Sequence, residues 1–174
     1  ALAASAGEEY EALLRQRVLA PMGLTRTSIT LTGEQGQLLA RGYTTLLQVG
    51  QMPLLKLPMP PIAFGALAGG GALKSDVEDM LRYLKGMMGA GDTDMAEMVA
   101  LGTSPHFELG PTDSVGLGWF VHMLPEGEGT LIWHNGQTYS FSSFVGYVPE
   151  KQTGVVVLNN TDMLVDEIAI SILE

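Results

Sequence analysis

The sequence has 174 residues, of which 46% are hydrophobic and 16% are charged. This composition excludes a disordered chain, and the length suits one domain with a sizeable core, so we expect residues 1–174 to form a single domain. Its 19 acidic and 9 basic residues give a net charge of -10, which repels phosphate backbones and anionic lipid headgroups and excludes nucleic acid as an expected partner.

The N-terminal residues predict a helix followed by short irregular segments. Residues 1–19 are mostly helix formers, and their apolar side chains recur at helical spacing. Pro21 and Gly23 end this helix, because proline cannot continue the hydrogen-bond ladder and glycine readily forms a left-handed cap. Residues 28–31 form a short β-like run, and we expect a turn at 33–36.

A proline-rich stretch precedes the second predicted helix. Residues 41–61 lose periodicity and contain four prolines, so we expect a long, irregular loop. Ser75 and Glu78 have the spacing of a capping box, which predicts that a helix starts there. Glycines within 89–91 end that helix. Its apolar stripe consists of Val77, Met80, Leu81, Leu84, Met87 and Met88.

The C-terminal half predicts an antiparallel sheet after a short helix over 95–101. The expected strands cover 115–123, 130–134, 141–148 and 154–158. The first two form a hairpin around an acidic turn at 125–129. An amphipathic helix that can lie across one sheet face is marked by Val165, Ile168, Ala169 and Ile172. The predicted fold class is therefore α+β, an antiparallel sheet flanked by helices with the C-terminal helix packed on it.

A polar cluster at the end of the second predicted strand is the main candidate site. His134 and Asn135 offer hydrogen-bonding groups, and Gly136 lets a ligand approach the backbone closely. On the residues alone, a binding edge and an ordinary hairpin end remain equally open. His106 and His122 lack a second ligand at helical or hairpin spacing, so we expect no metal.

Two absences narrow the chemistry further. The sequence contains no cysteine, which excludes a thiolate nucleophile and a disulfide framework. No apolar run approaches the roughly 20 residues that a membrane-spanning helix needs, so we expect no membrane segment.

Four segments, in this order, resemble the penicillin-recognising serine hydrolases of the class C β-lactamase type, with the related D-alanyl-D-alanine carboxypeptidases and β-lactamase-like esterases. They are Tyr10–Leu14 with Pro21–Leu24, Ala68–Gly71 with Lys74–Met80, Gly116–Trp119, and His134–Gly136 with Val156–Thr161. The resemblance covers nearly the whole chain. It implies part of a β-lactamase/transpeptidase-like fold, a small-molecule or peptide substrate in the full-length protein, no cofactor, and a periplasmic or secreted location.

The resemblance also implies roles for individual residues. In such enzymes a serine attacks a carbonyl carbon, a lysine and a tyrosine manage its proton, and backbone N–H groups hold the oxyanion. His134 and Gly136 match a His-x-Gly form of the third family motif, in which His134 would support the tyrosine. The N–H of Gln137 would be one of two oxyanion donors. The residues expected to contact substrate are Asn135, Thr138 and Asn160.

The sequence departs from the family at the nucleophile, because it contains no Ser-x-x-Lys, no Tyr-x-Asn and no Gly-x-Ser-x-Gly. The chain therefore resembles the C-terminal half of a family member, and we expect it to be inactive alone. Two hypotheses remain open: part of a serine hydrolase that supplies a cleft wall, or a noncatalytic module that self-associates or binds a partner through exposed apolar faces. Within the first, the choice between β-lactam, peptide and ester depends on cleft loops such as 44–64.

Overall fold

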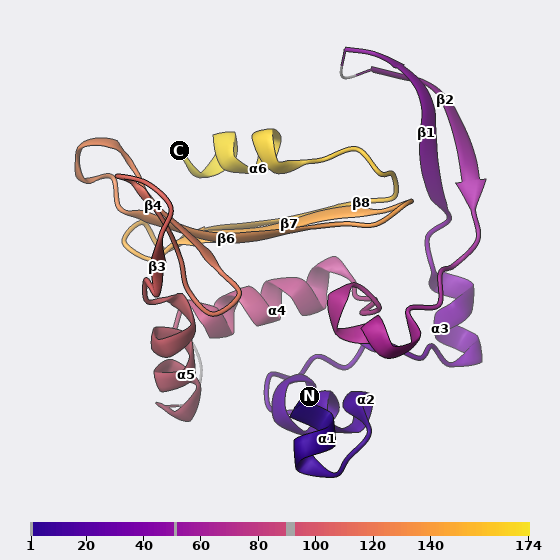
Figure 1. The fold of residues 1–174 in the computed structure, drawn as a ribbon, viewed down its shortest axis with the longest axis horizontal. Coiled ribbons are helices and arrows are strands. Elements are labelled where there is room, and N and C mark those ends of the chain that lie inside the picture. Colours follow the sequence, from indigo (N-terminus) through magenta and orange to yellow (C-terminus); the bar gives the residue numbers. More distant parts are fainter. Residues whose placement is uncertain (1, 51, 90–92) are drawn as a thin grey trace.

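The structure is a computed structural model that describes residues 2–50, 52–89 and 93–174. Figure 1 shows a sheet with helix α6 on one face and helix α4 on the other, and a separate hairpin of strands β1 and β2 beside it. The sheet is six-stranded and antiparallel, in the order β3-β4-β5-β6-β7-β8. The predicted α+β fold with an antiparallel sheet is confirmed.

The elements have the following bounds. The helices are α1 (Leu2–Ala6), α2 (Tyr10–Leu14), α3 (Gly33–Leu38), α4 (Val77–Met87), α5 (Thr93–Thr103) and α6 (Asp166–Leu173), with a π-helical segment η1 (Arg15–Leu19) and 3-10 segments η2 (Gly65–Gly70) and η3 (Pro125–Gly127). The strands are β1 (Gly42–Val49), β2 (Met52–Met59), β3 (Phe107–Glu108), β4 (Asp113–Val115), β5 (Phe120–Met123), β6 (Thr130–Gln137), β7 (Ser142–Val148) and β8 (Thr153–Asn159). Across the described ranges, no helix is long and apolar enough to span a bilayer.

Two apolar layers hold the sheet between its helices. On one face Leu131 and Phe144 pack with Ala169 and Leu173 of α6, which confirms the predicted C-terminal helix and its place on the sheet. The predicted stripe of that helix is wrong at Ile168 and Ile172, whose side chains are exposed. On the other face Leu84 of α4 belongs to a second buried cluster, whose members are Leu84, Met87, Trp119, Ile132 and Tyr147. Neighbouring residues of β6 therefore face opposite layers, as the two-residue period of a strand requires.

The proline-rich loop predicted over 41–61 is wrong, because most of that stretch forms the antiparallel hairpin of β1 and β2. Proline disfavours central strands, since it lacks the N–H that a ladder needs. Pro53 and Pro58 are tolerated here because β2 is paired on one side only. The turn predicted at 33–36 is also wrong: Thr32 caps helix α3 through a capping box with Gln35.

The N-terminal helix and the β-like run are only partly as predicted. Gly7, with φ of 68°, separates α1 from α2, so the expected continuous helix is interrupted, and Ala1 lies outside the described residues. Residues 28–31 form no strand, and Ser28 makes only an isolated bridge with Lys74. The segment after Gly23 instead binds the start of α4.

The predicted strand 115–123 is two strands, β4 and β5. Between them the chain turns to dock on the end of α5, where Leu117 donates its N–H to the carbonyl of Gly102 at 2.7 Å. That contact removes the intervening residues from the ladder. Three other predictions are confirmed, with ends shifted by a few residues. They are the hairpin around 125–129, the next two strands, and the short helix near 95–101.

The cap of α4 lies one residue after the predicted position. Asp76 is the N-cap and accepts from the N–H of Asp79 at 2.9 Å, while Ser75 lies 2.7 Å from the Thr27 hydroxyl. The helix ends at Met87, and part of its expected glycine stop over 89–91 lies outside the described residues. An acid at the cap itself does what the serine was expected to do.

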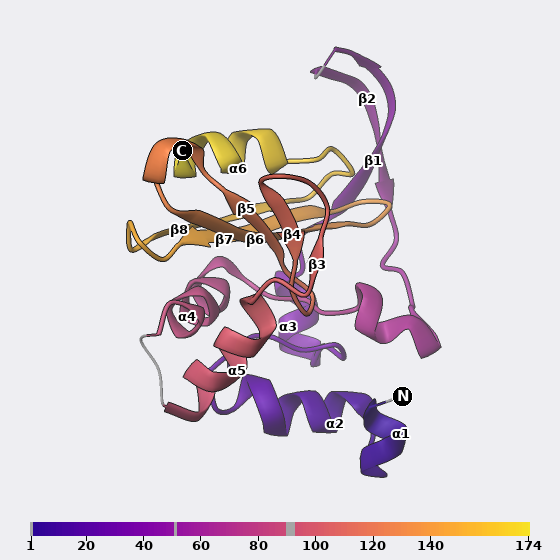
Figure 2. The ribbon, with the colours of Figure 1, turned by 60° about the vertical axis from the view of Figure 1, so that its left-hand side comes forward.

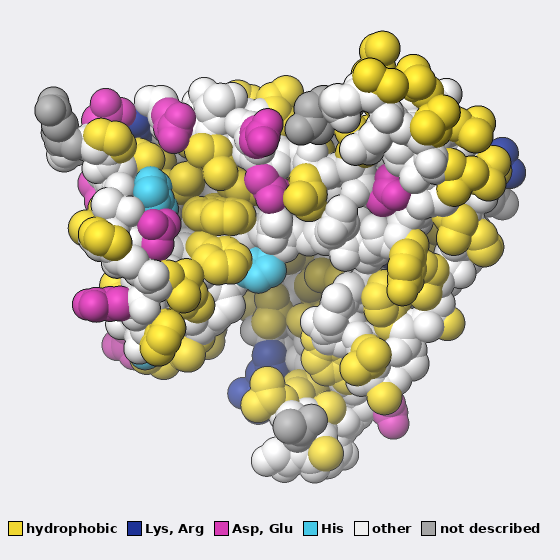
Figure 3. All heavy atoms as spheres, turned by 45° about the horizontal axis from the view of Figure 1, so that its top comes forward, with side chains coloured by type: hydrophobic (Ala, Val, Ile, Leu, Met, Phe, Trp, Pro, Cys, Tyr) yellow, Lys and Arg dark blue, Asp and Glu magenta, His cyan; other side chains and the backbone are white. Residues whose placement is uncertain are grey.

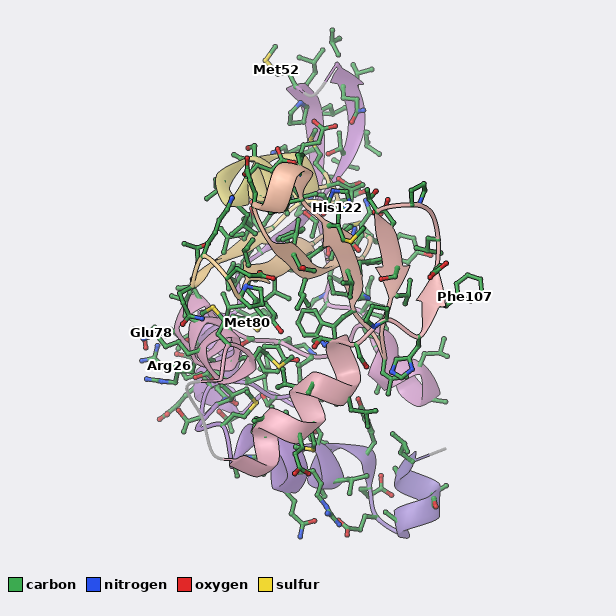
Figure 4. The ribbon with its side chains drawn as sticks, turned by 90° about the vertical axis from the view of Figure 1, so that its left-hand side faces the viewer. Arg26, Met52, Glu78, Met80, Phe107 and His122 are labelled. Carbon is green, nitrogen blue, oxygen red and sulfur yellow. The ribbon has the colours of Figure 1, made fainter. Side chains whose placement is uncertain are left out.

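Asp79 is fully buried and ties the segment after Gly23 to α4. Its carboxylate accepts from the N–H of Arg26 at 2.7 Å and the Thr27 hydroxyl at 2.8 Å, and from Arg82 at 2.9 Å. Figure 4 shows Arg26 beside the exposed Glu78, to which it makes a 3.2 Å ion pair. Buried donors that lose their acceptor are costly, so this contact fixes the two segments together.

We expect Asp79→Ala to lower the free energy of unfolding by about 2–4 kcal/mol, because it leaves buried donors without an acceptor. The matched control is Glu78→Ala on the adjacent, exposed position, which should change it by less than about 1 kcal/mol. Urea denaturation followed by circular dichroism measures both. Equal effects of the two substitutions would contradict the assigned role of Asp79.

Candidate functional site

Strand β6 extends beyond its neighbour β5. The ladder between them ends at the pair Phe120–Trp133, whereas the ladder between β6 and β7 continues to Gln137–Ser142. Residues 134–137 are therefore paired on one side only. This stretch is an open strand edge inside the sheet, formed where β5 stops short.

Two hydrogen bonds determine which backbone groups of β6 face this edge. At one end Leu124 donates its N–H to the carbonyl of Gly129 at 3.0 Å, and at the other Thr138 donates to Phe141 at 2.8 Å. Hydrogen-bonded pairs recur at every second residue of an antiparallel ladder. Odd-numbered residues of β6 therefore direct their N–H and C=O groups toward β5, and even-numbered residues direct theirs toward β7.

The alternation leaves two N–H groups at the open edge. His134 and Gly136 bond to β7, while Asn135 and Gln137 direct their backbone groups to the side where β5 has ended. A carbonyl oxygen or oxyanion placed against this edge could accept from the N–H of Gln137. The ladder between β6 and β7 fixes the backbone of Gln137, so its N–H already points into the open edge.

His134 is exposed beside the edge. Its ring stacks on Phe120, with centroids 5.8 Å apart, which limits its orientation. Nδ1 bonds to the carbonyl oxygen of Asn135. Because a carbonyl can only accept, this bond requires the proton on Nδ1 and leaves Nε2 as the nitrogen able to take up a proton.

Asn135 has its side chain on the opposite face from His134. It donates to the Asp166 carboxylate of α6 at 2.7 Å, so only the backbone of Asn135 is presented at the edge. Gly136 pairs with Ser143, and a β-carbon at Gly136 would lie 2.8 Å from the Ser143 hydroxyl. A side chain at this position would therefore crowd the neighbouring strand.

The remaining predicted site residues lie beyond the strand end. Gln137 donates its side chain to the carbonyl of Asp162 at 2.6 Å, and the Thr138 hydroxyl is 3.2 Å from the N–H of Phe141, which donates to it. Asn160 donates to the carbonyl of Arg41 at 2.9 Å, at the foot of the hairpin. The structure thus brings His134 through Thr138 together, and places Asn160 next to the segment that Gln137 binds.

An open pocket of about 490 Å³ lies beside this end of β6. It is lined by Ile62, Phe64, Gln137, Thr138, Tyr139 and Asp162. Asp162 also anchors the hairpin, accepting from the Thr44 hydroxyl at 2.9 Å and from the N–H of Thr45 at 2.9 Å. Burial alone would raise the pKa of this carboxyl, but the hydrogen bonds from Thr45 and Thr44 outweigh it and hold the pKa below its ordinary value.

Sequence reasoning missed part of this site. No sequence motif marks Ile62, Phe64 or Asp162. Asp162 lies two residues after Asn160, and that proximity to a predicted site residue was the one available signal for it. The two histidines judged isolated have protein partners: His122 binds Asp113 at 2.8 Å, a bond that lowers the pKa of Asp113, and His106 lies 3.0 Å from the Leu101 carbonyl. No metal-binding cluster occurs among the residues that the structure describes.

The fold is that of the class C β-lactamases. One class C β-lactamase structure matches 99% of this chain and 54% of its own length, with a TM-score of 0.82 and 20% identity. A β-lactamase/D-alanine carboxypeptidase from Pseudomonas syringae matches 97% of this chain and 53% of its own length, with a TM-score of 0.80 and 20% identity. An octameric penicillin-binding protein homologue from Pyrococcus abyssi matches 91% of this chain and 35% of its own length, with a TM-score of 0.70 and 23% identity.

The sequence agrees with this fold. The beta-lactamase family pattern matches residues 1–169, so the chain belongs to the beta-lactamase family. A beta-lactamase of Pseudomonas fluorescens is 28% identical over 189 aligned residues, which cover 91% of this chain and 50% of that protein. The chain spans about half the length of this curated relative.

The anchor at Asp162 should respond to acid. Because the folded structure lowers the pKa of Asp162, its ionised carboxylate stabilises the fold at every pH above the ordinary aspartate pKa of about 3.9. That stabilisation is lost as the pH falls through the lowered pKa. We therefore expect the amide resonance of Thr45 to shift below about pH 4 in NMR spectra. Asp162→Asn should abolish this titration, whereas an unchanged Thr45 titration in that variant would contradict the assignment.

Proposed function

We propose that this chain forms the β6 wall of an acyl-transfer site in a serine hydrolase that acts on a β-lactam, a D-Ala-D-Ala peptide or an ester. The observation that carries the proposal is the open edge, with the N–H of Gln137 directed away from β7. A tetrahedral intermediate of acyl transfer needs such donors, because its oxygen carries a developing negative charge.

In this proposal the N–H of Gln137 is one of two oxyanion donors. The second would come from the residue that carries the nucleophile, in a part of the enzyme that this sequence does not contain. Gly136 allows the substrate to lie flat along the edge, since it has no side chain. The backbone of Asn135, the pocket beside Thr138, and Asn160 would position the rest of the substrate.

His134 would assist proton transfer without touching the reacting carbonyl. Its bond to the carbonyl of Asn135 keeps the proton on Nδ1, so Nε2 can accept a hydrogen bond or a proton from the tyrosine that relatives of this kind use. Stacking on Phe120 keeps the ring beside the edge. His134 is therefore proposed as a positioning residue for the acid–base group.

The alternative function is a noncatalytic module that self-associates or binds a partner. Large apolar side chains that remain exposed favour it, among them Leu158, Leu164, Ile168 and Ile172. Exposed apolar patches commonly mark interaction surfaces. The two functions differ in a simple way, since only the first depends on the donors at the β6 edge.

The chain alone should neither hydrolyse nor be acylated by β-lactams. It lacks Ser-x-x-Lys, and oxyanion donors without a nucleophile leave only a small residual effect. A chromogenic cephalosporin should not be turned over, and a fluorescent penicillin should not label the polypeptide in a denaturing gel. A class C β-lactamase serves as the positive control, and stoichiometric labelling of this chain would contradict the proposal.

The oxyanion donor can be tested in a longer protein that carries this chain together with Ser-x-x-Lys and Tyr-x-Asn. Gln137→Pro removes the proposed donor but no ladder bond, so the variant should fold and its acylation rate should fall about 10²- to 10³-fold. Gln137→Ala is the matched control, since it changes the side chain and keeps the N–H. Equal rates in the two variants would remove Gln137 from the oxyanion site.

A further inference from the structure

The hairpin of β1 and β2 stands apart from the rest of the fold. The two strands form a two-stranded sheet of their own, from Gly42–Met59 to Val49–Met52, and outside it Tyr43 makes one isolated bridge with Thr161. Figures 1 and 2 show the ribbon rising away from the sheet, joined to it at its foot. Asp162 and Asn160 bind that foot, so the hairpin has a defined direction relative to the body.

Exposed apolar side chains dominate the hairpin. The register puts Leu47, Val49, Met52, Leu55 and Leu57 on one face, and Leu46 and Leu54 lie at its irregularities. The exposed apolar side chains, each 46–65% accessible, are Leu46, Leu47, Val49, Met52, Leu54, Leu55 and Leu57. Figure 3 shows apolar side chains gathered over the projecting hairpin, and Figure 4 shows Met52 at its far end.

The charge of the hairpin is opposite to that of the chain. Between Glu34 and Asp76 the sequence contains no acidic residue, although the chain has 19. Within residues 41–59 the charged side chains are Arg41, at the foot, and Lys56, while the Asp162 carboxylate binds Thr44 and Thr45 near the foot. An apolar, weakly cationic element thus projects from an acidic protein.

Edge-to-edge pairing with another strand is disfavoured. Pro53 and Pro58 remove N–H donors from β2, and the register of β1 is irregular between Thr45 and Gln48. Proline and bulges on edge strands hinder the addition of a further strand. The partner that fits this element is therefore one that contacts its exposed apolar side chains without using the strand edges.

We propose that the hairpin docks the protein on a lipid bilayer that contains anionic phospholipid. Its leucines, Val49 and Met52 enter the boundary between headgroups and acyl chains, where water and headgroups still satisfy the strand edges. Lys56, within the hairpin, contacts the anionic headgroups. The hairpin inserts at the surface and does not span the bilayer.

The length of the hairpin reconciles this docking with the net charge of -10. Strand β1 has 8 residues, so the hairpin is roughly 26 Å long at about 3.3 Å per residue. Electrostatic repulsion is screened over about 8–10 Å at physiological ionic strength. Inserted by its far end, the hairpin holds the acidic body beyond that distance from the membrane.

Vesicle co-sedimentation of the whole chain tests the proposal. We expect binding to phosphatidylcholine vesicles that contain phosphatidylserine, and a partition coefficient lowered about tenfold or more by the double substitution Leu47→Ser with Leu55→Ser. Lys56→Glu should weaken binding to these vesicles and leave binding to pure phosphatidylcholine unchanged. The matched control is Ile168→Ser with Ile172→Ser, equally exposed side chains on the acid-flanked helix α6, which should bind as the parent chain does.

Circular dichroism confirms folding of each variant, and light scattering in the absence of lipid monitors self-association. Absence of binding to either vesicle, or an equal loss of binding in the α6 control, would overturn the proposal. So would an oligomer that dissociates on Leu47→Ser with Leu55→Ser, because the hairpin would then serve a second copy of the chain. As an independent measurement, the fluorescence of Leu47→Trp should shift to the blue when vesicles are added.

Discussion

The early end of β5 is the constraint on which the site depends. Because β6 continues for four residues past Trp133 with only β7 beside it, the alternation of the ladder leaves the N–H groups of Asn135 and Gln137 unpaired by a neighbouring strand. The apolar layers on the two faces hold β6 in place, with Leu131 and Ile132 directed to α6 and α4 respectively. Donor orientation thus follows from sheet register and core packing rather than from any one side chain.

A single short segment connects this edge to the hairpin. Asp162 accepts from Thr44 and Thr45 through its carboxylate and from Gln137 through its carbonyl. Asn160 binds the carbonyl of Arg41 next to it. The pocket beside β6 has one wall from the end of β6 and one from the chain that follows the hairpin. The hydrogen bonds of Asp162 link the hairpin foot to the Gln137 side chain.

Sequence patterns predicted the sheet well and its surroundings poorly. The apolar runs of β6–β8 and the helical spacing of α6 predicted these elements, because the sheet packs against an apolar layer on each face. The hairpin was missed because its prolines suggested a loop and because Leu46 and Leu54, at irregularities of the register, interrupt the two-residue period. The His134 cluster was located from the sequence, but the route of the Asn135 side chain to Asp166 depends on strand parity and on α6, 31 residues later in the chain.

Family membership and the open edge together support our proposal that the chain provides the β6 wall of a serine-hydrolase site. Amide hydrogen exchange of the chain, followed residue by residue by NMR, tests its central claim most directly. The N–H groups of Asn135 and Gln137 should exchange rapidly, while those of His134 and Gly136, bonded to β7, should be protected. Equal protection of all four amides would mean that the edge is closed, and it would contradict the account.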